Sequence, residues 1–456
     1  MAENNSAGLE KKYGLMTATA MVIGNVIGSG VFFKAEKVQG VTGGDLPTGI
    51  LAWIIGGLIM VICANVFAVL ATRYEKCGGV MDYAEVTVGG KYAYFIGWFM
   101  ATIYYPTLVS VLGWVGARYF CVLCGWDITG GACLAIAGFF LMFFYVLNVL
   151  APRIAGKFQV STTVIKLIPL FLMVIFGIIS GLKNGVLVEN FTSGVIADVS
   201  GNPLLAAVIA TSFAYEGWIS ATSINAELKN AKRNLPLALT FGTLIVVVVY
   251  VLYYIGLAGT VPNADMMAGD GTGVRLAFSH IFKSLGGTLL FVFVIISCLG
   301  TLNGMMMGNI RNFYAIASRN QGPKPEVFGQ LDSATKMPLA SSILGLLVVA
   351  FWFLYFVGAN LVEVPWFGSF SFDSSEVPAV TTYALYIPIF VGMMLKEKEL
   401  GAFKRFVLPV LGVIACCMMI AAGIGGYGIK TIVCYLVIFA VIMGIGALFM
   451  NPKKKN

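Results

Sequence analysis

Charge is the scarcest property of this sequence. Only 11% of its 456 residues are Asp, Glu, Lys or Arg, whereas a soluble domain is about one quarter charged. This shortage argues against a soluble enzyme and against a nucleic-acid-binding module. Histidine occurs once, as His280, which the sequence places in a loop at 262–283. A histidine proton relay inside a membrane is therefore excluded.

Hydrophobic residues are abundant where charged residues are scarce. They make up 59% of the chain, and the mean hydropathy is +0.90. Abundant Ile, Leu, Val and Phe exclude intrinsic disorder. The 54 glycines suit membrane helices, in which Gly is more frequent than in soluble ones. The composition predicts an all-α membrane protein that lies in the lipid bilayer.

The hydrophobic runs are long enough to cross a membrane many times. A bilayer core of about 30 Å needs about 20 apolar residues in a helix. On this criterion we predict twelve transmembrane helices with mostly short connections. They lie near 13–33, 49–72, 92–120, 130–150, 157–181, 201–227, 236–261, 284–314, 338–358, 374–395, 403–424 and 429–450. Residues 1–12 form a polar tail without the pattern of a signal peptide, and 451–456 form a second tail.

The distribution of positive charge predicts the orientation. Of the 29 Lys and Arg residues, 21 fall in loops or at span ends on the side of both termini, and Lys166 alone lies well inside a span. The other seven are assigned to loops on the opposite side: Lys34, Lys37, Arg118, Lys183, Arg275, Lys283 and Lys430. Positive residues are enriched in cytoplasmic loops. Both termini should therefore be cytoplasmic, in a multi-pass protein of a bacterial cell membrane. The net charge of +8 is then a topology signal rather than a nucleic-acid footprint.

The first and sixth predicted spans are interrupted at similar depths. The first contains Gly28-Ser29-Gly30 about fifteen residues from its start, and Gly costs a helix about 1 kcal/mol relative to Ala. Taken alone, Gly24 and Gly28 could instead form a G-x-x-x-G packing motif. The sixth span, however, places Glu216 beside Gly217 at the same depth. A charge there costs about 2.5–3.5 kcal/mol and normally faces a cavity or a partner.

Interrupted spans at matching positions in two halves indicate a transporter binding site. We therefore expect 13–181 and 201–395 to form inverted repeats of five helices each, with 403–450 added. A break exposes N–H groups at the start of one half-helix and C=O groups at the end of the other. These suit the carboxylate and the ammonium of an α-amino acid. We expect the amides of Ser29 and Gly30 to bind the carboxylate, and the carbonyls around Val26, Phe213 and Ala214 to bind the ammonium.

Lys166 is the one cation that lies far from both ends of a predicted span. It lies nine residues from Lys157, or about 13 Å along a helix, which exceeds the reach of its side chain. Snorkelling to the interface is therefore the weaker explanation. The alternatives are a buried ion pair, for example with Glu216, a fixed cation in place of a coupling ion, and a proton carrier whose pKa burial lowers.

Five segments together resemble a known family. They are Val-Ile-Gly-Ser-Gly-Val-Phe at 26–32, Gly-Gly-Val-Met-Asp-Tyr at 78–83, Lys-Leu-Ile-Pro at 166–169, Phe-Ala-Tyr-Glu-Gly-Trp at 213–218 and Glu-Leu-Lys-Asn-Ala-Lys-Arg-Asn-Leu-Pro at 227–236. The whole chain resembles the amino acid–polyamine–organocation (APC) superfamily, in particular bacterial relatives of the L-type amino acid transporters. Serine/threonine and alanine–serine–cysteine exchangers are the most similar in character. The resemblance implies a LeuT-like 5+5 inverted-repeat fold of twelve helices that works by alternating access.

The resemblance also implies roles for individual residues. Lys166 matches a lysine that stands where sodium binds elsewhere, which implies sodium-independent transport. Phe213 matches a gate, and Tyr250 a tyrosine beside that lysine, although Tyr253 and Tyr254 compete for this assignment. The implied substrate-binding residues are Val26, Gly28, Ser29, Gly30, Phe213, Ala214, Glu216 and Tyr250.

Glu216 departs from the pattern, because relatives often have Gly or Asp there. The acid could pair with a cationic substrate or reduce the room for a bulky one. We expect an antiporter of small neutral L-α-amino acids (Ala, Ser, Thr, Cys). The alternatives are a proton-coupled symporter and an exchanger of cationic or larger neutral amino acids.

No enzyme is expected, because the spans lack paired Asp residues and H-E-x-x-H. Asp373 and Glu376 lie near an outer loop, where solvated acids are ordinary. Cys121 and Cys124 form a C-x-x-C without the second pair or histidines that a metal site needs. We expect a monomer without a cofactor, metal or heavy-chain glycoprotein partner.

Overall fold

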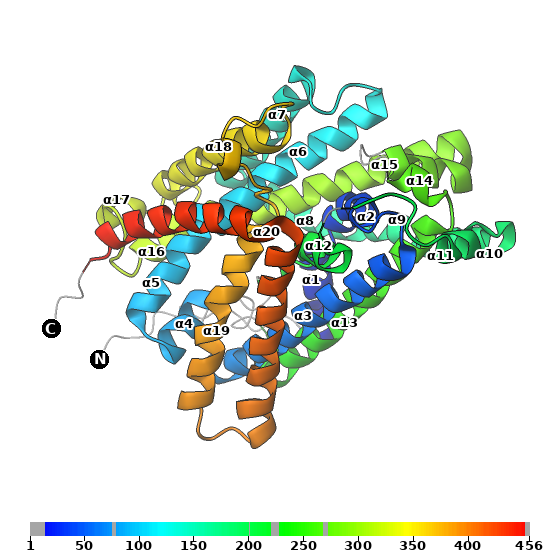
Figure 1. Cartoon of the computed structure of the whole chain (residues 1–456). Helices are drawn as coiled ribbons and strands as arrows, with labels where there is room; N and C mark the ends of the chain where they lie inside the picture. Colours follow the sequence, from blue (N-terminus) through cyan, green and yellow to red (C-terminus); the bar gives the residue numbers. More distant parts are fainter. Residues whose placement is uncertain (1–13, 75–78, 200, 220–227, 268–271, 452–456) are drawn as a thin grey trace.

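The computed structural model describes residues 14–74, 79–199, 201–219, 228–267 and 272–451 (Figure 1). The regular elements in these ranges are helices. In chain order they are α1 (Leu15–Val26), α2 (Gly30–Val41), α3 (Leu46–Arg73), α4 (Val80–Thr87), α5 (Gly90–Phe99), η1 (Met100–Tyr104), α6 (Tyr105–Cys124), α7 (Gly131–Leu150), α8 (Pro152–Ile165), α9 (Leu167–Leu172), η2 (Met173–Gly177), α10 (Ile178–Asn184), α11 (Val186–Thr192), α12 (Pro203–Ser212), α13 (Ala231–Ala258), α14 (Asn263–Met266), α15 (Thr272–Asn309), α16 (Asn312–Ala317), α17 (Pro325–Phe328), α18 (Leu339–Asn360), η4 (Gly368–Phe370), α19 (Pro378–Lys396), η5 (Phe403–Val407) and α20 (Leu408–Leu448). The prediction of an all-α protein is confirmed for the described residues.

Nine helical runs in the described ranges are long and apolar enough to cross a membrane. A tenth is obtained when α1 and α2, which meet at a 47° bend, are counted as one broken span. These runs agree with the predicted spans to within a few residues at most ends. The main difference at the start of the chain is that α2 continues to Val41, eight residues beyond the predicted end.

The predicted count of twelve depends on two further regions. The predicted sixth span contains α12 and an irregular stretch up to residue 219, and its last part, 220–227, lies outside the described residues. The two last predicted spans lie in one run, Phe403–Leu448, of 46 residues. At 1.5 Å per residue this run is about 69 Å long, twice the thickness of a bilayer core.

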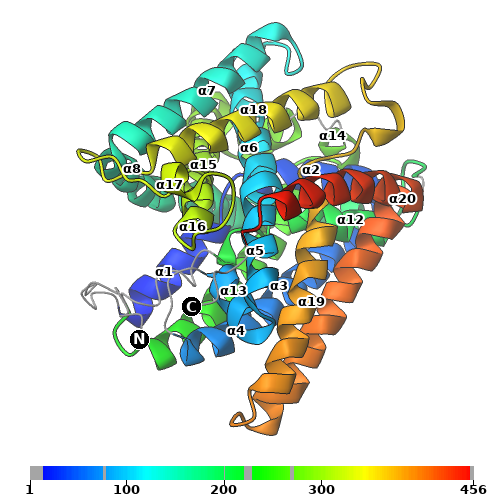
Figure 2. The same ribbon diagram turned by 90° about the vertical axis from the view of Figure 1, so that its left-hand side faces the viewer.

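Gly428 interrupts that long run. Its backbone angles, φ 78° and ψ 152°, are not helical, and glycine adopts a positive φ without a steric penalty. Figures 1 and 2 show α20 running beside α19 and then turning through a corner. The break falls between the predicted spans 403–424 and 429–450. The count of twelve and the inverted repeat nevertheless stay predictions.

Two further interruptions position side chains near the centre of the bundle. Lys166 separates α8 from α9, because Pro169 has no N–H for the carbonyl of Ile165 and its ring clashes with it. The π-helix η1 precedes α6, which has Pro106 in its first turn. Such π-helical insertions are frequent at functional sites.

The expected loop at 262–283 is partly helical. It contains α14 and the first part of α15, which is interrupted at Lys283 (φ 59°, ψ −175°). His280 therefore lies in a helical segment rather than in a loop, and its Nδ1 is 2.9 Å from the carbonyl oxygen of Thr260.

The helices that carry the two predicted breaks lie inside the bundle. α1 packs on α13, and α2 packs on α12 and, less extensively, on α15. α12 in turn packs on α3 and α20, while α6 packs on α15 and α7. Residues far apart in the sequence therefore meet around the breaks in α1/α2 and after α12.

Candidate substrate site

The break between α1 and α2 leaves helix ends inside the protein. α1 ends at Val26, and α2 begins at Gly30. The last four carbonyls of a helix and its first four amides have no partner within the helix. The carbonyl end of α1 and the amide end of α2 therefore both lie at this break, as the sequence predicts.

Two side chains donate hydrogen bonds to the free carbonyls of α1. The ammonium of Lys166, which is 1% exposed, donates to the carbonyl of Gly24. The hydroxyl of Tyr250 donates to the carbonyl of Val26 at 3.0 Å. A cation at the carbonyl end of a helix also interacts favourably with the helix dipole. The ion pairs of the described residues do not include Lys166 with Glu216, so that alternative is not supported.

The second break follows α12, which ends at Ser212. Residues 213–217 form turns, in which the amide of Ala214 donates to the carbonyl of Thr211 at 3.0 Å. Gly217 has φ +100°, and a Cβ there would lie 2.5 Å from the carbonyl oxygen of Asn25. Glycine is therefore required at this position for two reasons. Its positive φ disfavours other residues, and the close contact with the first break leaves no room for a Cβ.

The two breaks touch each other. A Cβ added at Gly30 would lie 2.5 Å from the Cα of Ala214, and the hydroxyl of Tyr250 also donates to the carbonyl of Ala214 at 3.2 Å. Between the breaks lies a cavity of about 20 Å³. Seven of the predicted site residues line it: Val26, Gly28, Ser29, Gly30, Phe213, Ala214 and Glu216.

Lys166 and Tyr250 do not line this cavity. Instead, they donate hydrogen bonds to the carbonyls of Gly24 and Val26 at the end of α1. The competing tyrosines lie elsewhere: Tyr254 donates to Oε1 of Gln39, and the Tyr253 hydroxyl has no hydrogen-bond partner among the described residues. Of the three tyrosines, Tyr250 alone joins the two breaks.

Sequence reasoning missed the walls that α6 and α15 contribute. The additional lining residues are Leu108 and Leu112 of α6, Thr301 and Met305 of α15, and also Asn25 of α1. Thr301 has a direct role, because its hydroxyl accepts a hydrogen bond from the amide of Ser29 at 3.2 Å. One of the two amides predicted for a carboxylate is therefore already paired. A single Thr in an apolar helix carries no signal that would have identified it.

Glu216 reaches a partner that the sequence did not indicate. The hydroxyl of Tyr104, the last residue of η1, donates to Oε2 of Glu216 at 2.5 Å. Both side chains are buried or nearly so. The carboxylate is therefore held at the edge of the cavity by a neutral donor rather than by a cation.

Comparison with known proteins agrees with this geometry. The model of the amino acid permease family matches residues 13–454. The chain belongs to this family. It is 29% identical over 399 residues to the serine/threonine exchanger SteT of Bacillus subtilis, which covers 87% of this chain and 86% of the relative.

Two further relatives of the permease show the breadth of the family. The glutamate/serine transporter AimA of Bacillus subtilis is 24% identical over 98% of this chain and 82% of its own length. The human cystine/glutamate transporter is 26% identical over 74% of this chain, and the match spans 66% of the relative's length. The family and these relatives are transporters, not enzymes. The permease is therefore an amino acid transporter of the APC family and a multi-pass membrane protein.

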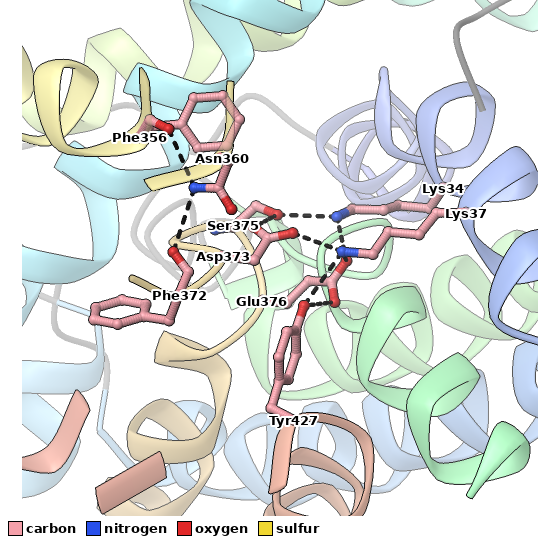
Figure 3. A network of polar contacts seen from close by, with 9 residues as sticks. All are labelled: Lys34, Lys37, Phe356, Asn360, Phe372, Asp373, Ser375, Glu376 and Tyr427. Atoms are coloured by element: carbon pink, nitrogen blue, oxygen red, sulfur yellow. Dashed lines mark hydrogen bonds and ion pairs between the residues drawn. The ribbon is translucent and has the colours of Figure 1, made fainter. Parts of the chain in front are cut away.

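A cluster of charged side chains joins α2 to the segment before α19 and to α20 (Figure 3). We call it the α2 ion cluster, and it comprises Lys34, Lys37, Asp373, Ser375, Glu376 and Tyr427. Lys34 pairs with Glu376, and both are at most 1% exposed. Lys37 lies 2.6 Å from Oδ2 of Asp373 and 2.7 Å from Oε1 of Glu376.

This cluster corrects two expectations. The acids near the outer loop are not solvated, because α2 places two ammonium groups against them. The lysines do not lie in a loop either, since α2 extends past both. Burial alone would raise the pKa of Asp373, but the ammonium groups of Lys37 and Lys34 more than offset this and hold it below its usual range.

A second buried ion pair joins α2 to α6. Nη2 of Arg118 lies 3.1 Å from Oε2 of Glu36, and both residues are at most 2% exposed. The sequence had placed Arg118 among the loop cations, but α6 continues to Cys124 and carries Arg118 inside the bundle. Together, the two sets of ion pairs fasten α2 to α6 and to the segment before α19.

Proposed function

We propose that the permease is a sodium-independent antiporter of small neutral L-α-amino acids such as Ala, Ser, Thr and Cys. The observation that carries this proposal is the contact of two helix breaks around one cavity of about 20 Å³. A cavity of this size holds only about one or two water-sized groups, so it must enlarge to admit any substrate, and the smallest amino acids require the least enlargement. The name of the serine/threonine exchanger among the relatives supports the same substrate class.

Backbone groups at the breaks would bind the substrate's main chain. The amide end of α2, with Gly28, Ser29 and Gly30, supplies a partial positive charge for the carboxylate. The carbonyls of Val26, Phe213 and Ala214 supply acceptors for the ammonium. Because Thr301 bonds the amide of Ser29, we propose that a substrate carboxylate replaces or joins this contact. Phe213 would act as a gate, and Glu216 would limit the side chain.

Lys166 would act as a fixed cation. Its ammonium bonds the carbonyl of Gly24 at the end of α1, where a positive charge stabilises the helix dipole. A sodium ion would be redundant at this end of α1, which supports sodium-independent transport. The same bond ties Lys166 to the half-helix that must move if access to the site alternates.

We further propose the architecture and orientation that the sequence predicts. Residues 13–181 and 201–395 would be inverted repeats, 403–450 would add two helices, and the tails 1–12 and 451–456 would be cytoplasmic. The break between α1 and α2 in one proposed repeat, and the end of α12 in turns at 213–217 in the other, support this division. The α2 ion cluster would then lie at the outer face. A monomer is proposed, without a heavy-chain partner.

Uptake into proteoliposomes tests the proposal. Radiolabelled serine and alanine are supplied to vesicles that are either preloaded with unlabelled amino acid or empty, with and without sodium and proton gradients. Uptake only into preloaded vesicles, independent of both ions, is the expected result. Accumulation in empty vesicles driven by a proton gradient would instead establish a symporter. Lys166→Met would then show whether the proton response depends on this residue.

A further inference from the structure

A second, smaller cavity adjoins the candidate substrate site. The two cavities share Leu108 and Glu216 in their walls. The second has a volume of about 10 Å³, which is room for about one water-sized group. Its wall is rich in hydroxyl groups, which belong to Tyr104, Thr107, Ser212, Ser374, Ser375 and Thr382. We call it the hydroxyl subsite.

Most of these hydroxyls already have partners. Thr107 donates to the carbonyls of Ile103 and Tyr104, and Thr382 donates to that of Pro378. The hydroxyl of Ser375 donates to Asp373 and accepts from Lys34. Tyr104 donates to Glu216. These four groups are therefore satisfied within the protein.

Ser212 and Ser374 differ from the rest. They are 2% and 1% exposed, and neither Oγ has a hydrogen-bond partner among the described residues. Buried polar groups in native proteins nearly always have a partner. Two unpaired hydroxyls in the wall of one small cavity therefore indicate that a ligand group supplies the missing hydrogen bonds.

We propose that the hydroxyl subsite binds the side-chain hydroxyl of a transported serine or threonine through Ser212 and Ser374. The inference rests on the proposed function, in which the two helix breaks bind only the main-chain groups of the substrate. The side chain then has the adjoining cavity available beside Leu108 and Glu216. A hydroxyl both donates and accepts, so it can satisfy both serines at once. A methyl group can satisfy neither.

Threonine and valine separate this proposal from simple size selection. The two amino acids have the same shape, with a hydroxyl in one where the other has a methyl. A site built to hydrogen-bond a substrate hydroxyl rejects the analogue that lacks it. We expect uptake of threonine at low substrate concentration to exceed that of valine by at least about tenfold, and serine to exceed alanine in the same direction.

The experiment measures uptake of labelled threonine and valine by the full chain in preloaded proteoliposomes. Ser212→Ala and Ser374→Ala should each lower the threonine-to-valine ratio, mainly by slowing threonine. Ser371→Ala is the matched control, because its hydroxyl is also unpaired but lies outside both cavities. The ratio is measured within one preparation, so it does not depend on how much protein folds.

The possible outcomes distinguish failure of the hydroxyl subsite from failure of the proposed function. A ratio near one in the unmodified permease, with both amino acids transported, would overturn the hydroxyl subsite and leave the proposed function standing. An undiminished ratio in both serine variants would overturn the assignment to Ser212 and Ser374. Failure to transport serine, threonine, alanine or valine at all would overturn the proposed function, and the subsite with it.

Discussion

The two halves of the first broken helix differ in how firmly the protein holds them. α1 and α2 have 12 residues each. In α1 four residues are buried, namely Ala18, Val22, Gly24 and Val26. In α2 eight are buried, and they include the charged residues Lys34 and Glu36. The half that carries charge is therefore the half that is more enclosed.

The attachments of the two halves are also of different kinds. α2 is tied by its side chains to other helices, through Lys34, Glu36 and Lys37. α1 has no charged side chain. The ties described for it are carbonyl groups near its end, which accept hydrogen bonds from Lys166 and Tyr250.

This difference indicates which half is fixed. Removing one partner from a buried ion pair leaves an uncompensated charge, which is strongly unfavourable, so α2 resists displacement. α1 is held by packing on α13 and by hydrogen bonds to its carbonyls, and these contacts can shift with less loss than a buried ion pair can be broken. If access to the site alternates, we expect α1 to be the half that moves more readily.

Weakening the α2 ion cluster should have the largest effect. Lys34→Met leaves Glu376 buried with one ammonium fewer, and breaking a buried pair costs about 3–5 kcal/mol. We expect a lower thermal unfolding temperature and greater reactivity of a cysteine introduced at the α2 end. Glu399→Gln is the control, because Glu399 is 79% exposed and exposed pairs contribute about 0–1 kcal/mol. Equal effects of the two changes would contradict the comparison.

The second largest effect is expected from a substitution at the contact between the two breaks. Gly30→Ala places a Cβ 2.5 Å from the backbone of Ala214, and relieving this clash requires a shift of either the start of α2 or the turns at 213–217. We expect transport to fall by about two orders of magnitude, or about 2.7 kcal/mol. Gly40→Ala in the same helix is the control, because nothing lies within 4 Å of its added Cβ. Normal uptake by Gly30→Ala would show that the breaks are further apart during transport.

A smaller effect is expected from one hydroxyl of α13. Tyr250→Phe removes the hydrogen bonds to the carbonyls of Val26 and Ala214. The two carbonyls share one hydroxyl proton, so the loss is about 0.5–1.5 kcal/mol, and transport should slow by up to about tenfold. Tyr253→Phe removes a hydroxyl without a partner among the described residues, and its transport rate should be unchanged. If both variants behave alike, Tyr250 does not hold the end of α1.

The smallest expected effect concerns pH. The pKa of Asp373 lies below its usual value of about 3.9. The stability that the Asp373 carboxylate contributes to the α2 ion cluster is therefore fully present above about pH 4. It is lost only as the pH falls through the lowered pKa of Asp373. Asp373→Asn should leave the shape of the pH–rate profile between pH 5 and 8 unchanged. A shifted profile would mean that Asp373 titrates in this range.

Local features of the helices were predictable from the sequence, whereas long-range pairs were not. The breaks follow from glycines and a buried acid within a few residues of each other, so a short window reveals them. Lys34 and Glu376 are 342 positions apart, and Ser29 and Thr301 are 272 apart. Without the fold, a lysine beside a predicted span end is indistinguishable from a loop cation, and Lys34 was misplaced for that reason.

The candidate site shows the same division. Seven cavity residues came from the two interrupted segments, where composition itself is unusual. Leu108 and Met305 are ordinary apolar residues of long helices, and only the packing of α6 and α15 brings them to the cavity. Tyr104 was missed because η1 changes the helical phase ahead of α6, which no hydrophobic periodicity predicts.

The π-helix η1 also determines how the faces of α5 and α6 are oriented relative to each other. Before it, α5 is fitted to the end of α20, since Tyr94 donates to the carbonyl of Gly446 and Trp98 to that of Ile442. After it, α6 presents Leu108 and Leu112 to the cavity. Each residue of an α-helix turns the chain by about 100°. Deleting one residue from 100–104 would rotate one of these contact sets away from its partners while the other stayed in place. The π-helix thus allows one continuous span to contact α20 through α5 and to line the cavity through α6, although a regular α-helix would not orient both faces correctly.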